Sequence, residues 1–177
     1  MKSKKEVYNI TLSAIFLALA YVFPFFTGQI PEIGSMLCPM HIPVLLCGFI
    51  CGWKYGLVVG LISPLLRSLT LGMPPLFPTA LAMSLELAAY GVASGLIYKL
   101  LPKKIVSIYV ALSLAMLLGR FVWGLAMFCF LGFSYNKFGL STFWIGGFVN
   151  ALPGIIVQLV LIPVIIMAYY KLKKENE

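Results

Sequence analysis

Five polar side chains that could bind a ligand fall inside otherwise apolar stretches of the sequence. They are His41, Arg67, Glu86, Arg120 and Asn150. An ionisable group is costly in an apolar environment, so each of them marks a candidate site that should face the interior of a helix bundle. The guanidinium group of arginine offers paired N–H donors that suit a carboxylate. With two arginines and one acid, this set predicts a small pocket that accepts a carboxylate or another anionic group of a ligand.

Each of these residues also has a simpler explanation. Glu86 and Arg120 could form a structural ion pair that holds two helices together. Arg67 could extend to the lipid headgroups, and His41 could cap a helix or be solvated at the membrane interface. Asn150 could hold two helices together through a hydrogen bond as readily as it could bind a ligand.

Three aromatic residues, Tyr90, Trp123 and Trp144, are expected close to Glu86 and Arg120, where they could form the apolar wall of a ligand pocket. Core packing is the alternative for all three. Catalytic chemistry is not indicated, because the sequence has one histidine, no paired carboxylates and no Gly-rich phosphate loop. The four cysteines form no CxxC pair, so neither a metal site nor a cofactor is expected.

The elements that must position these residues are membrane helices. Of the 177 residues, 62% are apolar and only 10% are charged, whereas a soluble domain has roughly 25% charged residues. Six spans of about 20 residues would use about 120 residues and leave no room for a sizeable soluble domain. We therefore predict an all-α integral membrane protein, a six-transmembrane-helix bundle forming a single membrane domain over residues 1–177. The expected helices are 9–26, 41–52, 56–71, 77–100, 105–131 and 142–170.

The distribution of basic residues predicts the orientation of this bundle. Of the 13 Lys and Arg residues, ten fall on the side of the termini, one (Lys137) falls on the other side, and Arg67 and Arg120 lie within spans. By the positive-inside rule both termini should be cytoplasmic, and the loops near 27–40, 72–77 and 132–141 should face outward. The net charge of +8 is thus explained by topology, and no nucleic-acid partner is expected.

The same assignment places the polar residues at a common depth. At a rise of about 1.5 Å per residue, Glu86 and Asn150 lie about 12 Å, and Arg120 about 16 Å, below the outer ends of their helices. His41 and Arg67 lie just above this layer, so the predicted pocket opens outward.

The first helix allows a second interpretation. Its basic start and the triplet Ala18-Leu19-Ala20 are also typical of a cleaved signal peptide. The apolar run continues past the triplet to Phe26, which favours an uncleaved helix. Ala14 and Ala18 form a small-xxx-small face on this helix that permits close approach of another helix.

Several of these features together resemble the substrate-binding S component of an energy-coupling factor (ECF) vitamin transporter. They are Ala14-x-x-x-Ala18, the long outward loop after the first helix, the run from His41 to Gly52, and Gly72-Met73-Pro74-Pro75. The resemblance covers nearly the whole chain. It implies a high-affinity binding subunit for a small water-soluble vitamin or precursor, with no enzymatic activity of its own, in a bacterial plasma membrane.

The resemblance also implies the partners. An ECF coupling transmembrane protein would contact Ala14 and Ala18, and two cytoplasmic ATPases would supply the energy. The loop after the first helix would act as a gate. The His41 run and the Gly72-Met73-Pro74-Pro75 turn are most similar to the branch that includes pantothenate S components, although related members take other vitamins. Two alternatives stay open: a stand-alone secondary transporter of a small polar solute, with Glu86 as a proton site, and an intramembrane enzyme.

Overall fold

The computed structural model of the protein describes residues 2–27, 36–102, 104–132 and 143–175. These residues form helices and connecting turns, and no β-strand occurs among them. The long elements, in chain order, are α1 (Lys2–Val22), α3 (His41–Cys51), α4 (Trp53–Leu71), α5 (Leu81–Leu100), α6 (Ile105–Met127) and α9 (Leu152–Glu175). Short 3-10 or π segments adjoin them: η1 (Phe23–Thr27), η2 (Leu76–Ala80), η3 (Phe128–Gly132) and η4 (Ile145–Val149).

The break between α3 and α4 is narrower than the sequence suggested. Residues 53–55 were expected to separate the two helices, but Gly52 alone does so, with φ at 99°. Glycine has no Cβ and adopts this backbone conformation without strain. The next helix therefore begins at Trp53, and Gly56 lies inside α4.

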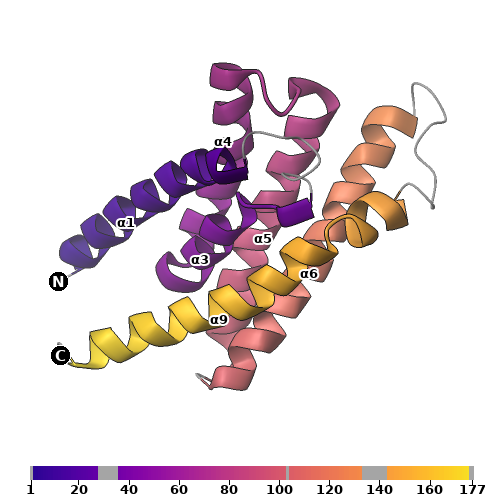
Figure 1. The fold of residues 1–177 in the computed structure, drawn as a ribbon. Helices are drawn as coiled ribbons and strands as arrows, with labels where there is room; N and C mark the ends of the chain where they lie inside the picture. The colour runs from indigo at the N-terminus through magenta and orange to yellow at the C-terminus, as the bar shows by residue number, and fades with distance from the viewer. Residues whose placement is uncertain (1, 28–35, 103, 133–142, 176–177) are drawn as a thin grey trace.

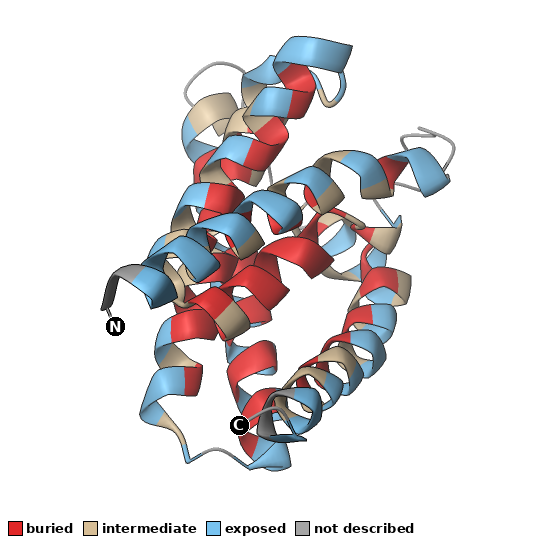
Figure 2. Cartoon of the chain, turned by 90° about the vertical axis from the view of Figure 1, so that its left-hand side faces the viewer, coloured by how far each residue is buried: buried red, intermediate tan, exposed pale blue. Residues whose placement is uncertain are grey.

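Helix α5 is the centre of the bundle and packs against α3, α4 and α6. Helix α1 packs on α3 and α4, while α9 packs on α3 and α6, and both chain ends lie on the same side of the molecule (Figure 1). Buried residues are concentrated in the middle of the bundle (Figure 2). In α3, ten of the 11 residues are buried, as expected for a helix that is apolar on every face.

Glycines bring α3, α4 and α5 into backbone contact. A Cβ added at Gly91 would lie 2.7 Å from the Cα of Gly56, and one added at Gly60 would lie 2.5 Å from the carbonyl carbon of Leu87. A Cβ at Gly95 would lie 2.5 Å from the backbone nitrogen of Trp53. On α3, a Cβ added at Gly48 would lie 2.5 Å from the carbonyl oxygen of Gly91. These distances leave no space for a side chain, so the close packing of the three helices depends on glycine at these positions.

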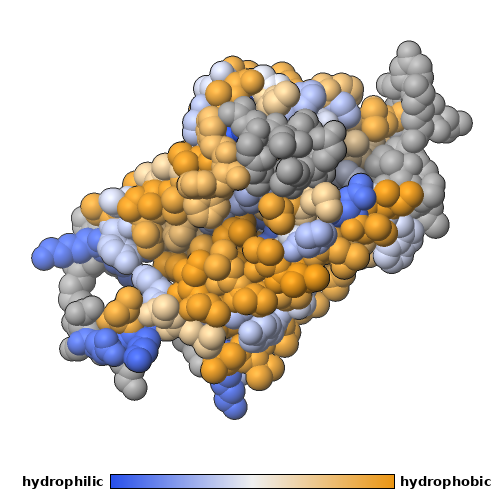
Figure 3. All heavy atoms as spheres, in the orientation of Figure 1, coloured by the Kyte–Doolittle hydropathy of each residue, from blue (hydrophilic) through white to orange (hydrophobic). Residues whose placement is uncertain are grey.

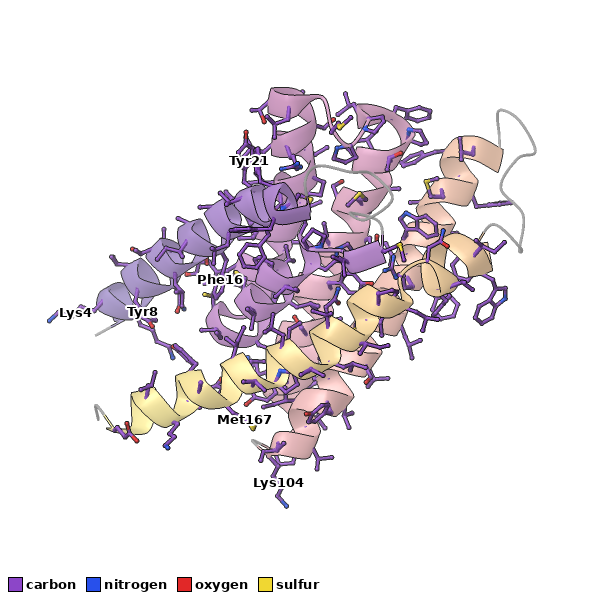
Figure 4. The ribbon with its side chains drawn as sticks, in the orientation of Figure 1. Lys4, Tyr8, Phe16, Tyr21, Lys104 and Met167 are labelled. Atoms are coloured by element: carbon purple, nitrogen blue, oxygen red, sulfur yellow. The ribbon has the colours of Figure 1, made fainter. Side chains whose placement is uncertain are left out.

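Four helical segments are long and apolar enough to cross a membrane: Lys4–Phe26, Leu76–Leu100, Ile105–Gly132 and Ile145–Leu172. Their outer faces form a broad hydrophobic surface, whereas hydrophilic side chains gather toward the end that carries the termini (Figure 3). Lys4 and Lys104 extend away from the bundle on its left and lower edges (Figure 4). The chain is therefore an all-helical, multi-pass membrane protein.

Candidate functional site

A buried carboxylate lies at the centre of the candidate site. Glu86, on α5, is 1% exposed, and its Oε1 lies 2.9 Å from Nη1 of Arg120 on α6. The Tyr90 hydroxyl, one turn further along α5, donates a hydrogen bond of 3.1 Å to the same oxygen. His41 Nε2, at the first residue of α3, lies 3.5 Å from it. Three helices thus direct polar groups at one carboxylate.

The segment before α3 adds a fifth group to this polar cluster, which we define as Cys38, His41, Glu86, Tyr90 and Arg120. Arg120 Nη2 donates to Cys38 Sγ at 3.5 Å. Nothing in the spacing of Cys38 along the sequence indicated this contact. The His41 and Tyr90 rings meet edge to face, with centroids 5.2 Å apart. All five residues are buried.

Three nitrogen atoms of the polar cluster have no hydrogen-bond partner among the described residues. They are Nδ1 of His41, Nε of Arg120, and Nε2 of His41, which has only the 3.5 Å ionic contact with Glu86. Leaving a buried donor or acceptor unpaired costs about 1–3 kcal/mol, and most such groups in folded proteins are satisfied. The lack of partners for these nitrogens suits a binding site in which a bound molecule supplies the missing hydrogen bonds.

The backbone explains how the helices reach these positions. Glu86 and Tyr90 are four residues apart and therefore lie on one face of α5. Gly119 precedes Arg120 on α6, and a Cβ there would lie 2.9 Å from Cζ of Tyr90. The absence of a side chain at Gly119 lets α6 approach closely enough for Arg120 to reach Glu86.

Arg67 contacts a different part of the molecule. Its Nη1 donates a hydrogen bond of 2.9 Å to the carbonyl oxygen of Tyr21 at the end of α1, and its guanidinium lies 5.0 Å from the Phe25 ring centroid. Arg67 is only 3% exposed. Among the described residues these two contacts connect α4 to the end of α1, and neither involves the polar cluster.

Trp123, Trp144 and Asn150 also lie apart from the polar contacts of Glu86. The Trp123 ring stacks on Phe143 at a centroid distance of 6.4 Å, and Trp144, which is 54% exposed, packs against Phe148 at 4.9 Å. Asn150 is exposed in the turn before α9. Of the expected layer of Glu86, Arg120 and Asn150, the structure joins the first two in an ion pair, and Asn150 takes no part in that contact.

The small-residue face of α1 is exposed. Ala14 and Ala18 both lie on the surface, while Ser13, Phe16 and Ala20 of the same helix are buried. Residues 28–35, in the loop expected to act as a gate, and residues 133–142, in the last outward loop, lie outside the described residues.

The comparisons with known proteins identify the class of this chain. Residues 8–166 match the family model for the substrate-specific component of ECF transporters. No curated protein and no solved structure matched the chain. Because the match covers most of the sequence, the chain belongs to the family of ECF transporter substrate-specific components.

Family membership confirms the resemblance inferred from the sequence. ECF substrate-specific components bind a small-molecule substrate for an importer and are not themselves enzymes. They work with an ECF transmembrane protein and with ATPases.

Proposed function

We propose that the polar cluster binds the substrate of this ECF component from the outer side of the membrane. The single observation that carries the proposal is the convergence of His41, Glu86 and Arg120 from three helices, with three of their nitrogens lacking a hydrogen-bond partner among the described residues. Buried nitrogens without such partners are uncommon in folded proteins, which favours a bound molecule as the missing partner. Tyr90 supplies an aromatic ring and a hydroxyl in the same place.

The proposed substrate is a small water-soluble vitamin or precursor that carries a carboxylate and hydroxyl groups, with pantothenate as the favoured example. Arg120 would supply paired donors to the carboxylate, while His41 and Tyr90 would contact hydroxyl groups. Trp123 and Trp144 remain candidates for an apolar wall, and Arg67 and Asn150 remain candidates for substrate contact.

The proposed topology has six crossings with both termini cytoplasmic, in a bacterial plasma membrane. Helix α3 has 11 residues, about 16 Å at 1.5 Å per residue, which is shorter than the roughly 30 Å hydrocarbon core. The segment before it would complete the crossing, because the buried Cys38 already places that segment inside the protein. Non-helical backbone at membrane depth is tolerated when protein covers it.

A thermal-shift screen of the purified protein against water-soluble vitamins tests the proposed function. A ligand at 100 times its Kd stabilises the folded state by about 2.7 kcal/mol, so a cognate vitamin should raise the melting temperature clearly. The double variant Glu86→Gln/Arg120→Met provides the control and should not respond. A screen in which the response of this variant equals that of the wild-type protein would contradict the assignment of the site.

The exposed alanine face of α1 is proposed as the contact with the coupling transmembrane protein. Replacing Ala14 or Ala18 by Leu should leave vitamin binding unchanged, because both residues lie outside the core, but should stop uptake in cells that express the whole transporter. Ala168→Leu, at an exposed position of α9, is the matched control and should transport normally. Loss of vitamin binding in the α1 variants would instead assign the alanines to packing within the bundle.

A further inference from the structure

A second site lies at the end of the molecule that carries the termini. A cavity of about 440 Å³ is lined there by the ends of α1, α3, α5 and α9. Figure 2 looks toward this end of the bundle. The residues of the polar cluster do not line this cavity, so the substrate site and this cavity are separate.

The lining of the cavity is basic. It includes Lys5 of α1 and Lys99 of α5, and none of the described residues that line it is acidic. Both ion pairs of the described residues involve Glu86, so neither lysine is paired with a carboxylate there. Two cations facing one cavity without an acidic partner favour an anion as the missing counterpart.

Hydroxyl and amide groups surround the two lysines. The hydroxyl groups of Tyr8 and Tyr169 are hydrogen-bonded at 3.3 Å and link α1 to α9 beside the cavity. Asn9, Tyr98 and Tyr170 also line the cavity. Hydroxyl and amide donors combined with ammonium groups suit the oxygens of a phosphate.

The depth of the cavity corresponds to the lipid headgroups. Trp53 lines it, with the Lys54 ammonium 5.7 Å from its ring centroid, and tryptophan and tyrosine are enriched where headgroups meet the hydrocarbon core. Helices α1 and α9, which line the cavity, also expose apolar side chains near it: Val7 on α1 and Leu172 on α9 are each 60% exposed. An occupant with acyl chains could cover this apolar surface, which a free phosphate ion could not.

We propose that this cavity binds the phosphate group of an anionic phospholipid. Lys5 and Lys99 contact the phosphate, the tyrosine hydroxyls and Asn9 donate hydrogen bonds to it, and the acyl chains lie against the exposed apolar residues of α1 and α9. Basic cavities between membrane helices on the cytoplasmic side are suited to anionic headgroups. The proposed substrate site takes no part in this binding.

Native mass spectrometry of the purified full chain, with phosphatidylglycerol or phosphatidylcholine added, tests the proposal. Wild-type protein should retain phosphatidylglycerol in preference to phosphatidylcholine. The Lys5→Gln/Lys99→Gln variant should bind phosphatidylglycerol about thirtyfold more weakly, because each lysine near the headgroups contributes roughly fivefold in affinity. Lys104→Gln serves as the matched control, because Lys104 is exposed like Lys5 and Lys99 but lies at the start of α6, outside the cavity. This variant should bind phosphatidylglycerol like the wild type.

Three results would overturn the proposal. The first is equal phosphatidylglycerol affinity in the wild type and the double variant. The second is an equal loss in the double variant and in Lys104→Gln, which would indicate attraction by surface charge in general. The third is displacement of phosphatidylglycerol by millimolar inorganic phosphate, which would assign the cavity to a free anion. Vitamin binding to the double variant is measured in parallel and should be unchanged, so the outcome is independent of the substrate site.

Discussion

Replacing Arg120 by Ala is expected to remove vitamin binding and to lower the free energy of unfolding by about 3–5 kcal/mol. The substitution leaves Glu86, which is 1% exposed, without the guanidinium that lies 2.9 Å from it. A buried carboxylate without its counter-charge is strongly destabilising, and the group would have to be neutralised or hydrated. Equilibrium unfolding and vitamin titration of the purified variant measure the two effects separately.

The double variant Glu86→Gln/Arg120→Met separates a structural ion pair from a binding site. Removing both charges leaves no unpaired ion, so most of the stability lost in Arg120→Ala should return. Vitamin binding should stay lost, because the guanidinium donors are still missing. If the double variant binds the vitamin with wild-type affinity, the pair between Glu86 and Arg120 is structural only, and the substrate binds elsewhere.

Replacing Gly91 by Leu is expected to disrupt the packing of α4 on α5. Adding groups to a packed core usually costs about 1–3 kcal/mol, and here the obstacle is the backbone of Gly56, with its Cα 2.7 Å from the added Cβ. A backbone cannot rotate away as a side chain can, so the cost should exceed that range. Gly91 follows Tyr90 directly, so the same displacement should disturb the polar cluster.

Size-exclusion chromatography and thermal unfolding in detergent measure the effect of Gly91→Leu. The variant should elute largely as aggregate or melt far below the wild type. Leu85→Phe, which enlarges an exposed position of the same helix, is the control and should behave like the wild type. A Gly91→Leu protein that melts at the wild-type temperature would show that α4 and α5 do not need this close approach.

The spacing of glycines in the sequence indicates the close approach of α4 and α5. Gly56 and Gly60, and likewise Gly91 and Gly95, are four residues apart, the spacing typical of tightly packed membrane helices. Ala14 and Ala18 have the same spacing, yet both are exposed in the structure. Spacing identifies a small-residue face, but it does not reveal whether the partner helix belongs to the same chain.

The helix that carries Asn150 is less regular than the sequence indicated. One straight helix was expected from residue 142, whereas the π segment Ile145–Val149 and a turn precede α9, which begins only at Leu152. Asn150 therefore lies at a helix entrance and is exposed. For Arg67, the rise per residue predicted a position along α4 but not the direction in which the side chain points around the helix axis. In the structure the guanidinium points toward the end of α1.

The helical membrane class and the family could be predicted from the amino-acid sequence, because they follow from local hydropathy, charge and short motifs. Which polar residues meet became visible only in the folded chain: Cys38 contacts Arg120 across 82 positions of sequence, while Arg67 contacts α1. Such contacts depend on helix rotation and on the close approach that glycines permit, and neither is encoded in any one segment.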